Sequence, residues 1–67
     1  MTVFVNGEPR TLRDRATVSD VVTGMGREGG RGLAVAVNGE VVARSAWSDT
    51  HLTENDRVEV LEAIGGG

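Results

Sequence analysis

The stretch TVFVNGEPRTL, residues 2–12, contains two short β-strand patterns joined by Asn6-Gly7. Asn-Gly readily adopts the positive φ angles of a two-residue turn, so this stretch predicts an antiparallel β-hairpin. Pro9 lacks an amide hydrogen and cannot donate a hydrogen bond to a neighbouring strand. We therefore expect its strand at an edge of a sheet, which leaves the strand at Val3–Val5 free to lie in the middle.

A second hairpin is predicted around Asn38-Gly39, between the apolar run 33–37 and residues 40–43. The length of the run and its β-branched residues favour a buried strand over a helix. Val-Asn-Gly-Glu occurs at both 5–8 and 37–40, which we interpret as the same turn used twice rather than as a domain repeat.

A short helix is predicted between the two hairpins. Thr17 can cap its first amides, and Asp20 is spaced to answer it in a capping box. One apolar face then follows at helical spacing, and Gly26 suits the end of the helix. The residues of this face are Val18, Val21, Val22 and Met25. Residues 27–32 are rich in glycine but have neither the spacing nor the lysine of a phosphate-binding loop, so we expect a connector.

The remaining residues predict an irregular segment, a last strand and a tail. Residues 44–56 are polar and irregular, and their only large apolar residues are Trp47 and Leu52, which we expect to fold back onto the core. Residues 57–61 alternate polar and apolar, as in a strand with one buried face. The expected fold class is α+β: a mixed sheet covered by one helix, with the last strand parallel to the first, as in the ubiquitin-like β-grasp fold. Residues 1–64 would form this domain, and residues 65–67 a flexible tail.

Composition limits the cellular setting. The chain has 67 residues, which suits one small domain, and it has no cysteine for disulfides or thiolate metal sites. Its first residues do not resemble a secretory signal, and no stretch is long and apolar enough for a membrane helix. The net charge is −3 and the arginines are scattered, which argues against nucleic acid. We expect a cytoplasmic protein that does not contact membranes and is monomeric when free.

No catalytic or metal site is predicted. The sequence has no recognisable Ser/His/Asp arrangement, and His51 falls in a polar loop with no obvious partner. Three acids lie near it in the sequence, Asp49, Glu54 and Asp56, but their spacing matches no known metal site. We expect His51 to be a solvated loop side chain, and we expect no bound metal or cofactor.

Taken together, the chain resembles the ThiS-type sulfur carriers of thiamine biosynthesis over nearly its whole length. The resemblance rests on the strand with its turn at Asn6-Gly7, the Thr17 helix start, and four later segments. These segments are the strand 33–37 ending at Asn38, Arg44-Ser45-Ala46-Trp47, the approach 52–60, and the terminal Gly-Gly. Asn55-Asp56 stands where such carriers commonly have Gly-Asp, but asparagine also tolerates a left-handed turn.

The resemblance implies that the reactive group is the carboxylate of Gly67. An adenylating, E1-like partner would activate it with MgATP, and a sulfur donor such as a cysteine desulfurase would then convert it to a thiocarboxylate. A thiazole synthase would receive the sulfur. Glycine lacks Cβ, so Gly65 and Gly66 would let the tail thread a narrow channel in the partner. The carrier itself would not be an enzyme.

A few glycines bury too little surface for a specific complex, so the body of the domain should also contact the partner. We expect this contact near Val58, Val60 and Leu61, which cannot all face one side of a strand.

Three other functions remain open at this point. Carriers for molybdopterin or cysteine synthesis share the fold and the Gly-Gly chemistry. A ubiquitin-like modifier would instead form isopeptide bonds with lysines of its targets. A ubiquitin-like interaction module would bind partners without using its tail. Free thiocarboxylate protein, covalent conjugates, or a function that survives mutation of the tail would distinguish these possibilities.

Overall fold

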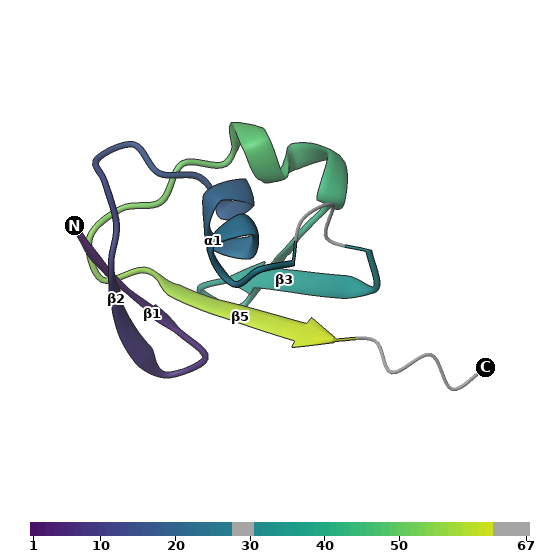
Figure 1. The fold of residues 1–67 in the computed structure, drawn as a ribbon, viewed down its shortest axis with the longest axis horizontal. Helices are drawn as coiled ribbons and strands as arrows, with labels where there is room; N and C mark the ends of the chain where they lie inside the picture. Colours follow the sequence, from purple (N-terminus) through teal and green to yellow (C-terminus); the bar gives the residue numbers. More distant parts are fainter. Residues whose placement is uncertain (28–30, 63–67) are drawn as a thin grey trace.

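The computed structural model describes residues 1–27 and 31–62, which form one mixed sheet and a helix packed on it (Figure 1). Residues 28–30, which belong to the predicted connector, lie outside the described residues. In chain order the elements are β1 (Thr2–Val5), β2 (Glu8–Thr11), α1 (Val18–Gly24), β3 (Leu33–Val37), β4 (Glu40–Val42), the 3-10 helix η1 (Arg44–Asp49) and β5 (Arg57–Glu62).

Both predicted hairpins are confirmed. The φ angles are 51° and 84° at Asn6-Gly7, and 51° and 86° at Asn38-Gly39, as a two-residue turn of this type requires. Val5 pairs with Glu8 in the first hairpin, and Val37 pairs with Glu40 in the second. The repeated Val-Asn-Gly-Glu therefore forms the same turn twice.

The sheet has the strand order β2-β1-β5-β3-β4, so the last strand of the chain is its centre. β5 runs parallel to β1 and antiparallel to β3. Pro9 lies on β2 at an edge, as predicted from its missing amide hydrogen. This arrangement is the β-grasp topology, and it directs the end of β5 away from the body of the domain (Figure 1).

Helix α1 begins with the predicted capping box. The Asp20 amide donates to Thr17 Oγ1 at 3.2 Å, and the Thr17 amide donates to Asp20 Oδ2 at 2.8 Å. Each residue thus satisfies a backbone donor that would otherwise have no partner at the helix start. Gly26 has a φ of 78°, and its left-handed conformation ends the helix where the sequence predicts.

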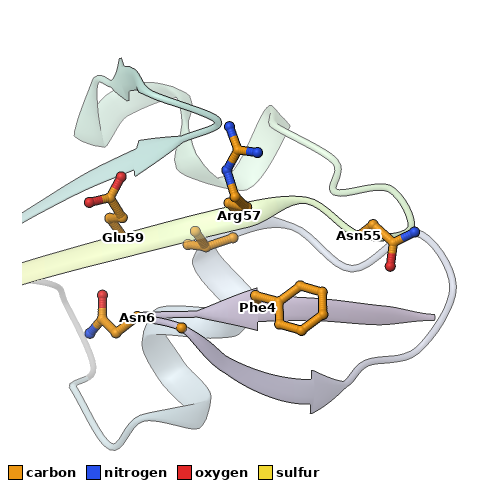
Figure 2. A pocket seen from close by; sticks show the side chains of 7 residues that line it. Phe4, Asn6, Asn55, Arg57 and Glu59 are labelled. Carbon is orange, nitrogen blue, oxygen red and sulfur yellow. The ribbon is translucent and has the colours of Figure 1, made fainter.

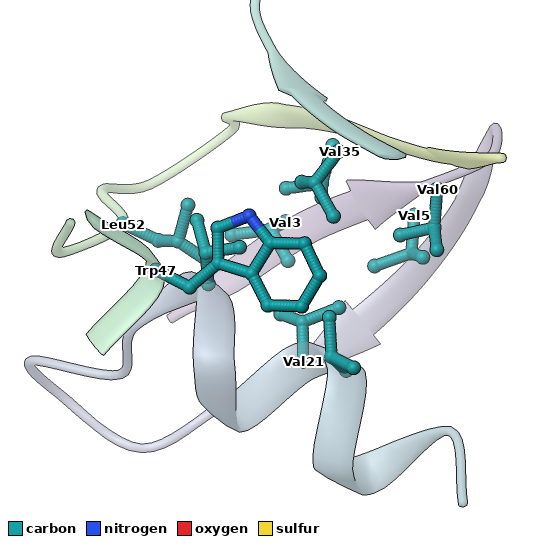
Figure 3. Close-up of a cluster of buried hydrophobic side chains, with 10 residues drawn as sticks. Val3, Val5, Val21, Val35, Trp47, Leu52 and Val60 are labelled. Carbon is teal, nitrogen blue, oxygen red and sulfur yellow. The ribbon is translucent and has the colours of Figure 1, made fainter. Parts of the chain in front are cut away.

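The core lies between α1, η1 and one face of the sheet (Figure 3). It consists mainly of valines from the strands and the helix, joined by Trp47 and Leu52. Trp47 is buried, and its indole Nε1 donates to the Val42 carbonyl at 2.9 Å, which anchors η1 over β4. The prediction that Trp47 and Leu52 close the core is confirmed. The expectation of an irregular segment was wrong at Arg44–Asp49, which forms a 3-10 helix.

Candidate functional site

The predicted reactive residues Gly65, Gly66 and Gly67 lie outside the described residues. The structure does describe the base from which they continue, the end of β5. There Leu61 pairs with Ala34 and Glu62 pairs with Leu33 on β3. Arg27 Nη2 lies 2.6 Å from Glu62 Oε2, but both side chains are substantially exposed, so we expect this ion pair to contribute little to stability.

The three residues predicted to bind a partner divide between the two faces of β5. Val58 is 0% exposed and Val60 is 7% exposed, so both belong to the core, whereas Leu61 is 64% exposed. Alternation along the strand explains this division as far as Leu61. The expectation for Val58 and Val60 is therefore corrected, because their side chains are covered by the helix layer. A partner contact at Leu61 stays a prediction.

On the face of the sheet away from α1, an open groove of about 760 Å³ follows β1 and β5 (Figure 2). Phe4 and Arg57 are cross-strand neighbours there, and Glu59 comes next along β5 on the same face. The groove therefore presents an aromatic ring beside a cation and an anion. Its lining residues are Phe4, Asn6, Gly7, Asn55, Arg57 and Glu59, together with the backbone of Val58, whose side chain faces the core.

Asparagine side chains from the two hairpin turns hold the backbone of β5, one near each end. Asn6 Oδ1 accepts from the Val60 amide at 2.9 Å, and its Nδ2 donates to the Val60 carbonyl at 3.2 Å. Asn38 Oδ1 accepts from the Arg57 amide at 2.9 Å. Sequence reasoning assigned both asparagines to turns only. The repetition of asparagine, where glycine or aspartate would also suit the turn, was the available signal.

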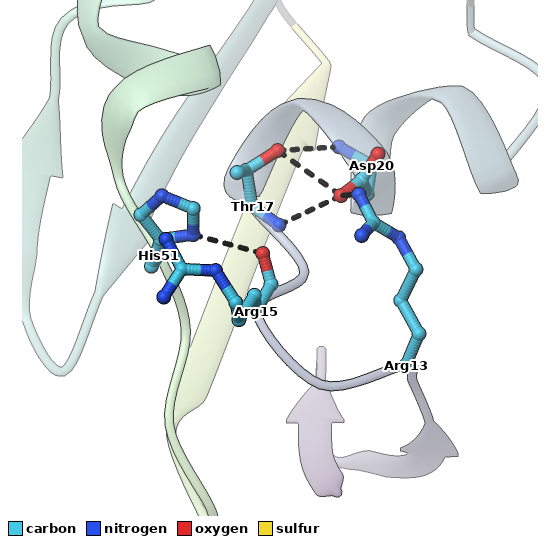
Figure 4. A network of polar contacts seen from close by, with 5 residues as sticks. All are labelled: Arg13, Arg15, Thr17, Asp20 and His51. Carbon is cyan, nitrogen blue, oxygen red and sulfur yellow. Dashed lines mark hydrogen bonds and ion pairs between the residues drawn. The ribbon is translucent and has the colours of Figure 1, made fainter.

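His51 is exposed, as expected, but it has a partner that the sequence did not reveal (Figure 4). Its Nδ1 lies 2.8 Å from the Arg15 carbonyl oxygen, and because a carbonyl can only accept, Nδ1 carries the proton. An isolated β-bridge joins His51 to Thr17. His51 thus helps to fasten the loop before α1 to the segment after η1, which is a structural role.

Asp20 and Asp56 are both engaged in local hydrogen bonds. A hydrogen bond from the Thr17 amide is the largest cause and lowers the pKa of Asp20; burial raises it, and Arg13, at 2.8 Å, adds to the lowering (Figure 4). Burial raises the pKa of Asp56, but hydrogen bonds from the Thr53 amide, Asn38 and the Thr53 hydroxyl outweigh it, so the pKa lies below its usual value. Both carboxylates are thus stabilised in the charged form.

These contacts account for two of the three acids considered as metal ligands. Asp56 serves the Thr53 turn, and Glu54 Oε1 accepts from the Thr2 amide at 3.0 Å. Across residues 1–27 and 31–62 the structure has no group of three or more His, Asp or Glu side chains placed to hold a metal ion. No helix in the same residues is long and apolar enough to cross a membrane.

The mixed sheet with one covering helix and β5 at its centre defines a ubiquitin-like β-grasp protein. The model of the ThiS family matches residues 3–67, so the chain belongs to the ThiS family. The crystal structure of the thiamine biosynthesis protein ThiS from Geobacter metallireducens is 32% identical, with a TM-score of 0.83 and full coverage of both chains. An NMR structure of a thiamine biosynthesis protein from the same organism gives a TM-score of 0.76 at 32% identity, covering all of this chain and 88% of that one. The family and the fold predicted from the sequence are confirmed.

Two curated relatives are much longer proteins. The thiazole synthase of Magnetococcus marinus is 34% identical over all 67 residues of this chain, and that of Paramagnetospirillum magneticum is 31% identical over the same length. In both cases the chain spans only 20% of the length of the relative. The rest of each relative has no counterpart in this sequence.

Proposed function

We propose that this chain is a sulfur carrier of thiamine biosynthesis that carries sulfur as a thiocarboxylate on Gly67. The observation that supports it best is the full-length likeness to ThiS, with a TM-score of 0.83 and coverage of both whole chains. The names of the longer relatives, both thiazole synthases, favour thiamine over molybdopterin or cysteine synthesis. The Gly65-Gly66-Gly67 run supplies the sequence that the proposed chemistry needs.

In the proposed reaction, an oxygen of the Gly67 carboxylate attacks the α-phosphorus of ATP on a partner enzyme. Pyrophosphate leaves, and the mixed anhydride with AMP turns a poor electrophile into a reactive one. A persulfide on a donor protein then attacks the carbonyl carbon and displaces AMP, which gives an acyl disulfide. A further thiol cleaves that disulfide, so that the thiocarboxylate is released and a disulfide is left on the protein that supplied the thiol. The resulting thiocarboxylate passes its sulfur to a thiazole synthase.

In this scheme the chain contributes shape rather than catalysis. Gly66 and Gly65 have no Cβ, so the tail can lie extended in a narrow channel while its carboxylate reaches the nucleotide. The partner enzyme binds MgATP and supplies the catalytic groups. We therefore propose that the chain is not itself an enzyme, and that it works in the cytoplasm, where its ATP-dependent partner would act.

The partner is proposed to grip the open face of the sheet as well as the tail. Leu61 is 64% exposed one residue from the end of β5, and Phe4 lies in the groove on the same side (Figure 2). A tail alone would bury far less than the roughly 800 Å² per partner of a stable complex, so the body must provide most of the interface.

Intact-mass measurement of the protein isolated from its native cells tests the proposal. It first establishes whether the mature chain ends at Gly67, and then whether part of it carries the oxygen-to-sulfur mass increase. Finding that increase at the C-terminus supports the carrier. Finding the chain joined to lysines of other proteins would instead identify a modifier.

A second test extends the tail. Adding one alanine after Gly67 turns the reacting acid into an internal amide and moves the new carboxylate about 3.5 Å further along the chain. We expect ATP–pyrophosphate exchange with the adenylating enzyme to be lost, and Gly66→Val to fail as well because a β-branched residue is bulkier and stiffer. Thermal melts should remain unchanged. Wild-type exchange by an extended chain that is not trimmed would exclude the proposed function.

A further inference from the structure

We infer that Asn6 is a positioning residue for the activation of Gly67. Its side chain holds Val60 from the β1 side, and so restricts the end of β5 from which the chain continues to the group that the adenylating partner must reach. The inference rests on the proposed function, because it concerns the reaction of that tail.

The backbone of β1 cannot hold β5 as far as Val60. The Phe4 amide donates to the Asp56 carbonyl at 2.9 Å, and the Asn6 amide donates to the Val58 carbonyl at 2.8 Å. After Asn6 the chain turns away into β2. In a regular parallel ladder the Val60 amide would next donate to the Asn6 main-chain carbonyl, but Asn6 already lies in the turn, with a φ of 51°, and does not continue the ladder with its backbone.

The Asn6 side chain supplies the hydrogen bonds that the backbone does not make at this point. A primary amide has both a donor and an acceptor, as a peptide group does. Oδ1 accepts from the Val60 amide at 2.9 Å, and Nδ2 donates to the Val60 carbonyl at 3.2 Å. Both polar backbone groups of Val60 are thereby satisfied on the β1 side, and the ladder is extended beyond the turn.

The contact decides where two-sided support of β5 ends. On its other side β5 pairs with β3 through Val60, Leu61 and Glu62. Val60 is thus held from both sides, whereas Leu61 and Glu62 pair with β3 alone among the described residues. Without the Asn6 side-chain amide, the last hydrogen bond on the β1 side would be the one from the Asn6 main-chain amide to the Val58 carbonyl, two residues earlier. Within the described part of the chain, Val60 would then be paired with β3 alone, as Leu61 and Glu62 are, and the end of β5 would be less restricted.

Asn38 provides an internal control. It occupies the same turn position, with the same φ of 51°, but its side chain binds the opposite end of β5. Oδ1 accepts from the Arg57 amide at 2.9 Å, and Nδ2 donates to Asp56 Oδ1 at 3.0 Å. Asn38→Gly therefore also removes two side-chain hydrogen bonds, one to the β5 backbone and one to the Asp56 carboxylate, at the end of β5 far from the tail, while glycine keeps the turn in both variants.

The experiment compares Asn6→Gly with Asn38→Gly in the full chain. ATP–pyrophosphate exchange is measured with the adenylating enzyme of the same organism, at varied carrier concentration and at a temperature where both variants are folded. For Asn6→Gly we expect kcat to fall roughly tenfold, because a misplaced reacting group is costly, with KM within about twofold because the proposed docking residues Phe4 and Leu61 are unchanged. For Asn38→Gly we expect both constants within about twofold of wild type.

Amide hydrogen exchange supplies a readout independent of the partner. Protection of the Val60 amide should fall roughly tenfold in Asn6→Gly and stay unchanged in Asn38→Gly. If Asn6→Gly does not fold, Asn6→Asp replaces it, with Asn38→Asp as its control. The aspartate keeps the turn and the acceptor but sets an oxygen against the Val60 carbonyl.

The outcomes separate the inference from the function on which it rests. A wild-type chain that supports no exchange overturns the proposed function. An active wild type, with equal kcat for the two variants, overturns the positioning role alone. A rise in KM at constant kcat for Asn6→Gly also overturns it, since Asn6 would then contact the partner directly.

Discussion

The two faces of the sheet differ in what covers them. On one face, Val3, Val35 and Val58 are almost completely buried beneath α1 and η1. On the other, Leu61 is 64% exposed and Val41 82% exposed, and the groove beside Phe4 is open. The covered face therefore provides most of the stability, whereas the open face has apolar surface available to a partner.

Val60 and Leu61 are adjacent in β5 but face opposite sides of the sheet, so the same substitution at each tests the difference between the two faces directly. Val60→Asp would place a carboxylate in the covered core. We expect the free energy of unfolding to fall by more than about 4 kcal/mol, which would leave most molecules of so small a domain unfolded. Leu61→Asp should change stability by no more than about 0.5 kcal/mol but weaken activation by the adenylating partner. Urea unfolding and ATP–pyrophosphate exchange measure the two effects. A folded Leu61→Asp chain with unchanged activation would show that this face does not dock.

Removal of Trp47 tests the covered face from its outer side. Trp47→Ala deletes a large buried side chain and leaves the Val42 carbonyl without the indole donor. We expect a loss of about 3 kcal/mol in urea unfolding. Trp47→Phe, which keeps most of the buried area, is the control and should cost about 1 kcal/mol. Equal losses for the two variants would mean that the buried area of the Trp47 side chain contributes little to the free energy of unfolding.

The helix cap gives a smaller effect on the same face. Thr17→Ala removes the hydroxyl that accepts from the Asp20 amide, and we expect a loss of about 1 kcal/mol. Thr17→Ser keeps the hydroxyl and should recover most of it. Thermal melts and urea unfolding provide the measurement. Activation of both variants should equal wild type below their melting temperatures, because the open face is untouched.

Acid should have the smallest effect. The folded pKa values of Asp20 and Asp56 lie below the ordinary value of 3.8, so their stabilisation is complete above that pH and is lost as the pH falls through the folded values. Unfolding free energy measured from about pH 6 down to about pH 2 should show this decline. Asp20→Asn and Asp56→Asn should each flatten it, because each removes a carboxylate whose folded pKa is lowered by its hydrogen bonds. An identical decline in wild type and both variants would assign the acid sensitivity to other carboxylates.

Local signals in the sequence predicted most of the fold. The Asn-Gly pairs determined both turns, Pro9 identified an edge strand, and Thr17 with Asp20 marked the helix start. Each of these signals acts within a few residues, so it can be recognised without knowledge of the tertiary structure. The terminal glycines and the resemblance to the family likewise predicted that the tail carries the reactive group.

The features that the sequence did not reveal all depend on residues far apart in the chain. Asn6 meets Val60 only because β5 inserts beside β1, and His51 meets Arg15 only because η1 returns the chain over the helix start. The division of Val60 from Leu61 was foreseen in part, since alternation required one of the three candidates to face outward. Which one faces outward depends on the register between β5 and β3.

The central position of β5 has a consequence for how the protein is made. Until residues 57–62 have been synthesised, the chain contains two separate hairpins, and isolated hairpins are marginal in water. A chain that stops after Asp56 should therefore lack stable structure, which circular dichroism would measure, and a cooperative melt of that fragment would contradict this. Folding then waits until β5 has been translated. Chains terminated before β5 would therefore be left unfolded for proteases to remove, rather than compete with the folded protein for its partners.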